Sequence, residues 1–126
     1  MKIPLLAAGL GLALAATTVH AQQDTLRIGA LVTLSGAGAA WGQGMQHAAE
    51  LAADDVNAEG GLEVGGKRYK VEVIPYDDKY QANEAVTVAN RLVFEDKVKY
   101  IIGPVGSAPV LAIQPITEKN GVIVMT

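Results

Sequence analysis

The sequence predicts a doubly wound α/β fold, in which helices cover both faces of a parallel β-sheet. Half of the 126 residues are apolar and 18% are charged, a composition that can bury a core. Segments with the pattern of a strand alternate with segments that repeat apolar residues at helical spacing, in the order βαβαβαβ. Because parallel strands are joined by crossovers that usually contain a helix, this alternation predicts a parallel sheet.

Four segments have the pattern of strands. Residues 69–74 alternate between apolar and polar side chains, which is typical of a strand with one solvated face. Pro75 follows, and proline is tolerated near a sheet edge or a strand end, so we expect this strand at the edge. The other three segments are almost wholly apolar and predict buried strands: 26–32, 100–103 and 122–125.

Three segments have helical spacing. The first carries its apolar stripe on Met45, Ala48, Ala49, Ala52 and Val56 and ends before the glycine pair at 60–61. The other two cover residues 82–93 and residues 109–119, where Pro115 introduces a potential kink.

The expected strand order places a ligand site at the carboxyl ends of the parallel strands. If strand 69–74 lies at the edge beside strand 26–32, strand 100–103 pairs with the other side of 26–32. The order then reverses between these two central strands, and ligands of open α/β sheets bind outside the carboxyl ends of strands at such a point. The loops that leave them are residues 35–41 and 104–109.

Two residues of these loops are candidates for ligand contact. Ser107 stands at the start of a helix, where free backbone N–H groups and the helix dipole suit a carboxylate. Its hydroxyl can donate to that ligand or cap the helix, and the two roles are compatible. Trp41 lies among glycine and alanine residues with little to pack against, so it is either a core residue or a wall for an apolar ligand.

Charge and composition exclude several functions. The formal net charge is −3 and no cluster of lysine and arginine is present, so the sequence does not predict a nucleic-acid partner. The chain has no cysteine, which excludes disulfides, thiolate zinc sites and cysteine nucleophiles.

Two glycine motifs resemble nucleotide-binding loops but fail. Residues 36–41 begin like the dinucleotide fingerprint G-x-G-x-x-G, but Trp41 replaces the third glycine, so an oxidoreductase is not predicted. Residues 61–67 fit G-x-x-x-x-G-K, but Arg68 replaces the serine or threonine and a strand follows where a helix is needed. We interpret the second motif as a turn that leads into the edge strand.

Two clusters that contain acidic residues are not predicted to bind a metal or to act in catalysis. His47, Glu50 and Asp54 share one helical face, which is more typical of a solvated surface than of metal ligands. Asp77 and Asp78 follow the second strand and could form an acid–base pair, but aspartate is common in turns. We therefore expect no metal, no cofactor and no enzymatic activity.

Residues 1–21 have the pattern of an export signal. Lys2 forms a short basic region, residues 5–16 are an apolar and small-residue run, and small or modest residues lead up to Ala21. The run is shorter than the roughly 20 residues that span a bilayer. We expect cleavage after Ala21 and a soluble product, residues 22–126, in the periplasm.

The last predicted strand ends one residue before the end of the chain, with no helix after it. Because a buried parallel strand is covered on both faces, we expect residues 22–126 to be an incomplete lobe. In isolation it should be poorly stable or aggregate.

The sequence resembles the periplasmic leucine/isoleucine/valine-binding proteins, the type I substrate-binding proteins of ABC importers. Five segments carry the resemblance in their order and spacing: IGALVTLSGAGAAWG, NAEGGLEVGGKRYKVEVIPYDD, QANEAVTVANRLV, YIIGPVGSAPVLA and GVIVMT. The resemblance implies that this chain is the amino-terminal lobe of a two-lobe protein that clasps a ligand. It also implies a monomer, when complete, that delivers the ligand to an inner-membrane permease.

The resemblance assigns roles to four residues. Trp41 matches an aromatic residue, usually tyrosine, that lines the ligand's side-chain pocket, and Val105, Gly106 and Ser107 match the loop that meets the ligand carboxylate. The ligand expected first is a branched-chain or other apolar amino acid. Aromatic acids and amides stay open, as does a ligand-sensing domain of the same fold in a receptor.

Overall fold

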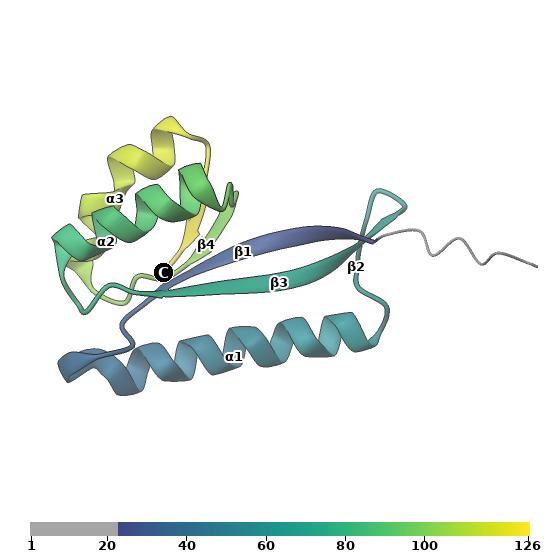
Figure 1. Ribbon diagram of the computed structural model, residues 1–126, viewed down its shortest axis with the longest axis horizontal. Helices are drawn as coiled ribbons and strands as arrows, with labels where there is room; N and C mark the ends of the chain where they lie inside the picture. Colours follow the sequence, from purple (N-terminus) through teal and green to yellow (C-terminus); the bar gives the residue numbers. More distant parts are fainter. Residues whose placement is uncertain (1–22) are drawn as a thin grey trace, which may run out of the picture.

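The computed structural model describes residues 23–126, which form a five-stranded sheet with helices on both faces (Figure 1). The predicted export signal lies outside the described residues. The strands are β1 (Asp24–Val32), β2 (Leu62–Val64), β3 (Lys67–Asp77), β4 (Tyr100–Ile102) and β5 (Ile123–Met125). The helices are α1 (Ala39–Ala58), α2 (Ala82–Asn90) and α3 (Ser107–Lys119), with a 3₁₀ turn at Gly36–Gly38 and a π-helical turn at Arg91–Glu95.

The strand order is β2-β3-β1-β4-β5, and every pair except β2–β3 is parallel. This confirms the predicted order of the four parallel strands and the doubly wound fold. The longest pairing joins β1 to β3, from Asp24 opposite Tyr69 to Val32 opposite Asp77. The reversal of strand order therefore falls between β1 and β4, as expected.

The edge of the sheet differs from the prediction. The strand expected at the edge, β3, carries a further antiparallel strand, β2, along its first residues. Gly65 and Gly66 join the two strands with φ values of 59° and 78°, the left-handed conformation of a tight hairpin turn. Gly65 and Gly66 are thus the predicted turn, but residues 62–64 before them form a strand, and so a hairpin, that the sequence interpretation missed.

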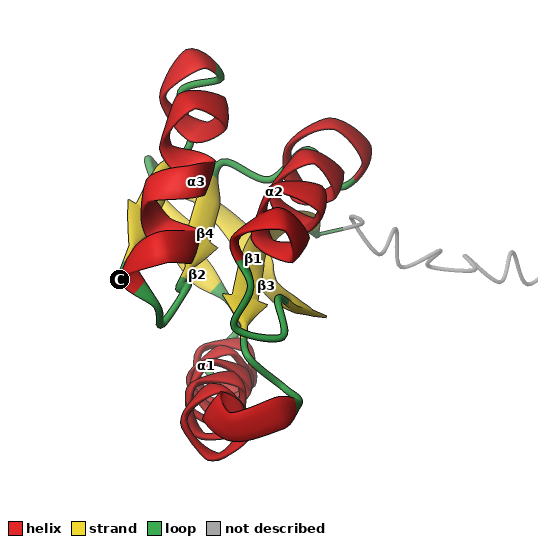
Figure 2. Ribbon diagram, turned by 90° about the vertical axis from the view of Figure 1, so that its left-hand side faces the viewer, coloured by secondary structure: helices red, strands yellow, loops and turns green. Residues whose placement is uncertain are grey.

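The main core lies between the sheet and the pair α2 and α3 (Figure 2). Leu31 of β1 and Ile101 of β4 point into it, and Leu92 packs over the sheet from the end of α2. Leu92 also explains Gly29, because a Cβ at that glycine would lie 2.9 Å from the Leu92 methyl groups. The other buried members of the cluster come mainly from the helices and their ends: Ala85, Val88, Ala89, Val93, Val98, Ile113 and Val122.

Helix α1 covers the opposite face of the sheet over β1 and β3 (Figures 1 and 2). Its close approach depends on Gly42, because a Cβ there would collide with the backbone of Thr33. The predicted apolar stripe is only partly buried: Ala48 and Ala52 are exposed. The face that packs on the sheet is rotated from this stripe, because Gly42 and Ala53 are buried and Asn57 is half-buried.

The third helix begins two residues earlier than predicted, at Ser107, and continues through Pro115. No helix within residues 23–126 is both long enough and apolar enough to cross a membrane.

Candidate functional site

The candidate site lies at the carboxyl ends of β1 and β4, at the sheet edge that faces the viewer in Figure 2. The segment after β1 leads into α1, and the segment after β4 leads into α3. A cavity of about 460 Å³ opens between them. Its lining is mostly apolar: Ala37, Gly38, Trp41, Tyr80 and Val105.

A second cavity of about 460 Å³ adjoins the first, and Val105 lines both. Ser107 and Met45 belong to this second cavity. Three of the four predicted site residues thus line these two cavities, which share Val105 and which the parallel sheet brings together from segments some 60 residues apart in the sequence. The fourth, Gly106, is buried and lines neither cavity.

Trp41 lies in the first turn of α1 and is 75% exposed. The alternative in which it is a core residue is therefore wrong. Its indole borders a cavity whose other walls are small or apolar, as the ligand-wall interpretation requires.

The amino terminus of α3 lies beside this region. Gly106, with φ −91° and ψ 140°, takes the cap position, and Ser107 is the first helical residue. No side chain caps the helix, so the capping role predicted for Ser107 is wrong. The Ser107 hydroxyl is exposed and does not bond to the helix it begins.

The first turn of α3 has backbone donors to offer. The first N–H groups of an α-helix have no intrahelical partner. Pro109 has no N–H, and the N–H of Val110 donates to the Gly106 carbonyl over 3.0 Å. The N–H groups of Ser107 and Ala108 therefore stand with the Ser107 hydroxyl at the positive end of the helix dipole, where an anion is stabilised.

Tyr80 is the residue of this region that sequence reasoning missed. It lines the same cavity as Trp41, is 55% exposed and has a left-handed backbone, with φ 60°. Tyr80 follows Asp77 and Asp78, which were interpreted as turn residues. The predicted turn was the one feature of the sequence that could have indicated a residue near the site.

The two aspartates organise this turn, which confirms the turn interpretation. Asp77 accepts hydrogen bonds from the backbone N–H groups of Leu34 and Lys79, each over 2.8 Å. Asp78 is fully buried and accepts from the Thr33 hydroxyl, over 2.7 Å. Both carboxylates therefore serve to fix loop backbone and side chains.

The environment of Asp77 favours its charged form. Burial alone raises the pKa of its carboxyl, but hydrogen bonds from the Ser35 hydroxyl and from loop N–H groups outweigh burial. The result is a pKa below the ordinary value. Asp77 thus stays ionised and keeps the start of the first loop attached to the turn.

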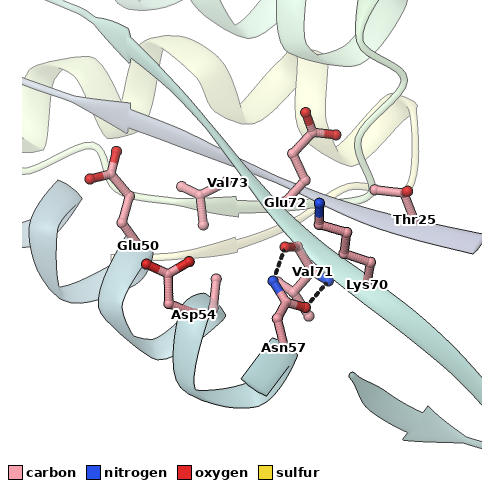
Figure 3. Close-up of a pocket in the computed structure, with 9 residues that line it drawn as sticks. Thr25, Glu50, Asp54, Asn57, Lys70, Val71, Glu72 and Val73 are labelled. Atoms are coloured by element: carbon pink, nitrogen blue, oxygen red, sulfur yellow. Dashed lines mark hydrogen bonds between the residues drawn. The ribbon is translucent and has the colours of Figure 1, made fainter. Parts of the chain in front are cut away.

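A further cavity, of about 560 Å³, lies elsewhere, between α1 and β3 (Figure 3). Glu50 and Asp54 line it with polar neighbours such as Lys70. His47 is exposed and does not line it. The groove lies along the middle of the strands, away from the carboxyl edge where open α/β sheets bind ligands.

Asn57 closes the sheet side of this groove. Its amide donates to the Val71 carbonyl and accepts from the Val71 N–H, each over 2.8 Å (Figure 3). The Asn57 side chain thus pairs with β3 just beyond Leu62, the first residue of β2. It satisfies backbone groups of β3 on the side that β2 no longer covers. We assign this contact a structural role.

The comparison with known families decides the class of the protein. Residues 25–126 match the family model described as periplasmic binding protein. The chain belongs to the periplasmic binding protein family. This agrees with the resemblance drawn from the sequence and with the observed lobe.

Curated proteins have sequences similar to that of this chain. The chain is 34% identical over 120 residues to an amino acid binding protein of Pseudomonas aeruginosa, a match that covers 91% of this chain and 31% of the relative. It is 32% identical over 115 residues to a Leu/Ile/Val-binding protein of Escherichia coli, covering 91% and 30%. The chain thus spans about a third of the length of the relatives it matches.

Solved structures of this family share the fold. A branched-chain amino acid transporter substrate-binding protein from Streptococcus pneumoniae, in complex with isoleucine, matches with a TM-score of 0.72 and 37% identity, over 80% of this chain and 28% of that one. A solute-binding protein from Rhodopseudomonas palustris, in complex with 3,4-dihydroxybenzoic acid, matches with a TM-score of 0.63 and 27% identity, over 81% and 26%. These two relatives hold ligands that share a carboxylate and differ in the rest.

Proposed function

We propose that this chain is part of the extracytoplasmic solute-binding component of an ABC importer. Its ligand is a small carboxylate with an apolar side group, and a branched-chain or other apolar amino acid is the first candidate. Membership of the periplasmic binding protein family supports the class, and the names of the curated relatives support the candidate.

One observation carries the ligand proposal: an anion-stabilising helix terminus stands next to an apolar cavity. Ser107 and the first turn of α3 supply donors for a carboxylate, and Val105 continues from this region into the cavity beside Trp41. A ligand with an acid at one end and an apolar group at the other fits this arrangement, in which the donors of α3 lie beside an apolar cavity.

The remaining parts of the proposal follow from the class. Residues 1–21 act as an export signal, and the mature domain from residue 22 onward works in the periplasm. There it binds its ligand as a monomer, without a cofactor and without catalysing a reaction. It delivers the ligand to an inner-membrane permease.

A second candidate is an aromatic acid. Trp41 offers a wider aromatic wall than the tyrosine usual at this position, and one solved relative holds 3,4-dihydroxybenzoic acid. Both candidates share the carboxylate, so they use the same donors at α3.

A titration of the complete protein tests the proposal. Trp41 emission is isolated as the difference between the wild type and Trp41→Phe, and binding is measured in parallel by calorimetry. We expect saturable binding of at least one of L-leucine, L-isoleucine, L-valine, L-phenylalanine and benzoate, with a change in Trp41 emission.

The matched controls are isopentylamine and phenethylamine, which are L-leucine and L-phenylalanine without the carboxylate. We expect neither to bind, because the donors at α3 then have no anion to meet. Binding of an amine as tight as that of its parent amino acid would contradict the proposed site, and failure of every carboxylate would contradict the proposed ligand class.

A further inference from the structure

We propose that Tyr80 is a ligand-contacting, specificity-determining residue that, together with Trp41, makes the apolar cavity select a planar aromatic side group. Within the proposed small carboxylates, this inference favours aromatic ligands, either an aromatic amino acid or a simple aromatic acid, over the branched-chain amino acids. This inference rests on the proposed function, since it places the carboxylate at α3.

The Tyr80 ring lies between the two loops that frame the cavity. A Cβ at Gly38, before α1, would be 3.5 Å from the ring atom Cδ2. A Cβ at Gly106, before α3, would be 2.9 Å from Cε2. The ring therefore rests on glycine backbone from both loops, and more than half of its surface stays open toward the cavity and solvent.

The backbone beneath the ring is held in an unfavourable conformation. Lys79 and Tyr80 both have positive φ, 52° and 60°, which is uncommon for residues other than glycine. Strained backbone of this kind persists where the surroundings fix it, and it clusters at binding sites.

Hydrogen bonds to the two preceding aspartates hold this backbone. The N–H of Tyr80 donates to the Asp78 carboxylate over 2.9 Å, and Asp78 itself is fully buried against Thr33. The N–H of Lys79 donates to Asp77. Tyr80 is thus positioned by groups that do not touch the cavity, so the ring is already in place before a ligand arrives.

The composition of the cavity explains the preference for a flat ligand. Ala37, Gly38 and Val105 offer small apolar surfaces, and the two large side chains are both aromatic. Aromatic side chains stack or meet edge-to-face with a ligand ring, which adds attraction beyond the burial of area. A branched aliphatic group makes the burial contacts without this additional term.

The test compares binding of L-phenylalanine, benzoate and L-leucine to the complete protein by calorimetry. In Tyr80→Leu we expect the tighter-binding aromatic ligand to lose about tenfold in affinity, since the ring contact is gone. L-leucine should change by less than about threefold, because leucine at position 80 preserves apolar area. Tyr80→Phe is the matched control and should keep the aromatic affinity.

A second variant covers the case in which Tyr80→Leu fails to fold. Tyr80→Gly removes the ring at a position whose positive φ suits glycine, so its fold should be retained in a circular dichroism melt. It should weaken aromatic binding more than L-leucine binding, and L-leucine should also lose some affinity because glycine removes apolar area together with the ring.

The role of Tyr80 would be overturned if Tyr80→Leu lost affinity equally for all three ligands. It would also be overturned if neither Tyr80→Leu nor Tyr80→Gly changed any affinity. If the variants leave binding unchanged while carboxylates still bind and their amines do not, the proposed function stands and only this inference fails. If the wild type prefers L-leucine to both aromatic ligands, the aromatic class is wrong.

Discussion

The position of the loop at residues 104–109 could be predicted from a general rule, because it follows a buried strand at the point where the strand order reverses. That argument needs only the pattern of strands and helices and singles out Ser107, whereas the roles of Val105 and Gly106 came from the family resemblance. Trp41 stood out as a large aromatic among small residues. The role of Ser107 as a helix cap could not be settled this way, because the cap position depends on a backbone angle at Gly106.

Tyr80 could not be predicted from the sequence. Its place depends on two consecutive positive φ angles and on a buried carboxylate from Asp78. Neither produces a periodic pattern, and both arise from contacts between segments 45 residues apart, such as Thr33 with Asp78.

At the residue scale, Ser107→Ala in the complete protein should weaken binding of the carboxylate ligand by about 1–2 kcal/mol, the cost of one charge-assisted hydrogen bond. Calorimetry measures this directly. Thr87→Val is the matched control, because the Thr87 hydroxyl donates to the Asn83 carbonyl of its own helix, away from the two cavities. It should leave the Kd nearly unchanged, whereas an unchanged Kd in Ser107→Ala would remove Ser107 from the site.

At the element scale, β2 was the one strand that the sequence did not predict. Strands β4 and β5 are equally short but were recognised because their segments are almost wholly apolar. Strand β1 and helices α1 and α2 carry enough residues to show their period. Strand β2 has three residues, Leu62–Val64, all exposed, and three residues cannot show an alternation. Its glycine pair, Gly65 and Gly66, was recognised as a turn but not as a hairpin.

The packing of α1 on the sheet supports a prediction for this element. Gly42→Ala should destabilise the complete protein by about 2 kcal/mol, because its Cβ would overlap the Thr33 backbone and push α1 away from β1. Gly44→Ala is the control on the same helix: it has open space around it. It should be neutral or stabilising by up to about 1 kcal/mol, since alanine favours helix over glycine.

Thermal unfolding followed by circular dichroism compares the two variants. If Gly42→Ala kept a melting temperature as high as that of Gly44→Ala, the helix would tolerate the added methyl group at either position. The close contact between α1 and Thr33 would then not be what positions Trp41.

At the scale of the whole molecule, the strand order was predictable because parallel crossovers leave few arrangements. Helices on both faces were predictable as well, but the part of the sheet that they leave uncovered was not, because it depends on where each helix lies. On the face that α1 shares, the side chains of Tyr100, Ile123 and Met125 stay exposed beside the region that the helix covers. These exposed apolar groups support the prediction that residues 22–126 alone aggregate.

The central claim is that a ligand carboxylate binds at the amino terminus of α3. A crystal structure of the complete protein with its bound carboxylate tests this most directly. We expect the acid within hydrogen-bond distance of the Ser107 hydroxyl and the first N–H groups of the helix, and the apolar group between the Trp41 and Tyr80 side chains. A ligand bound elsewhere, with this corner filled by the protein's own side chains, would contradict the claim.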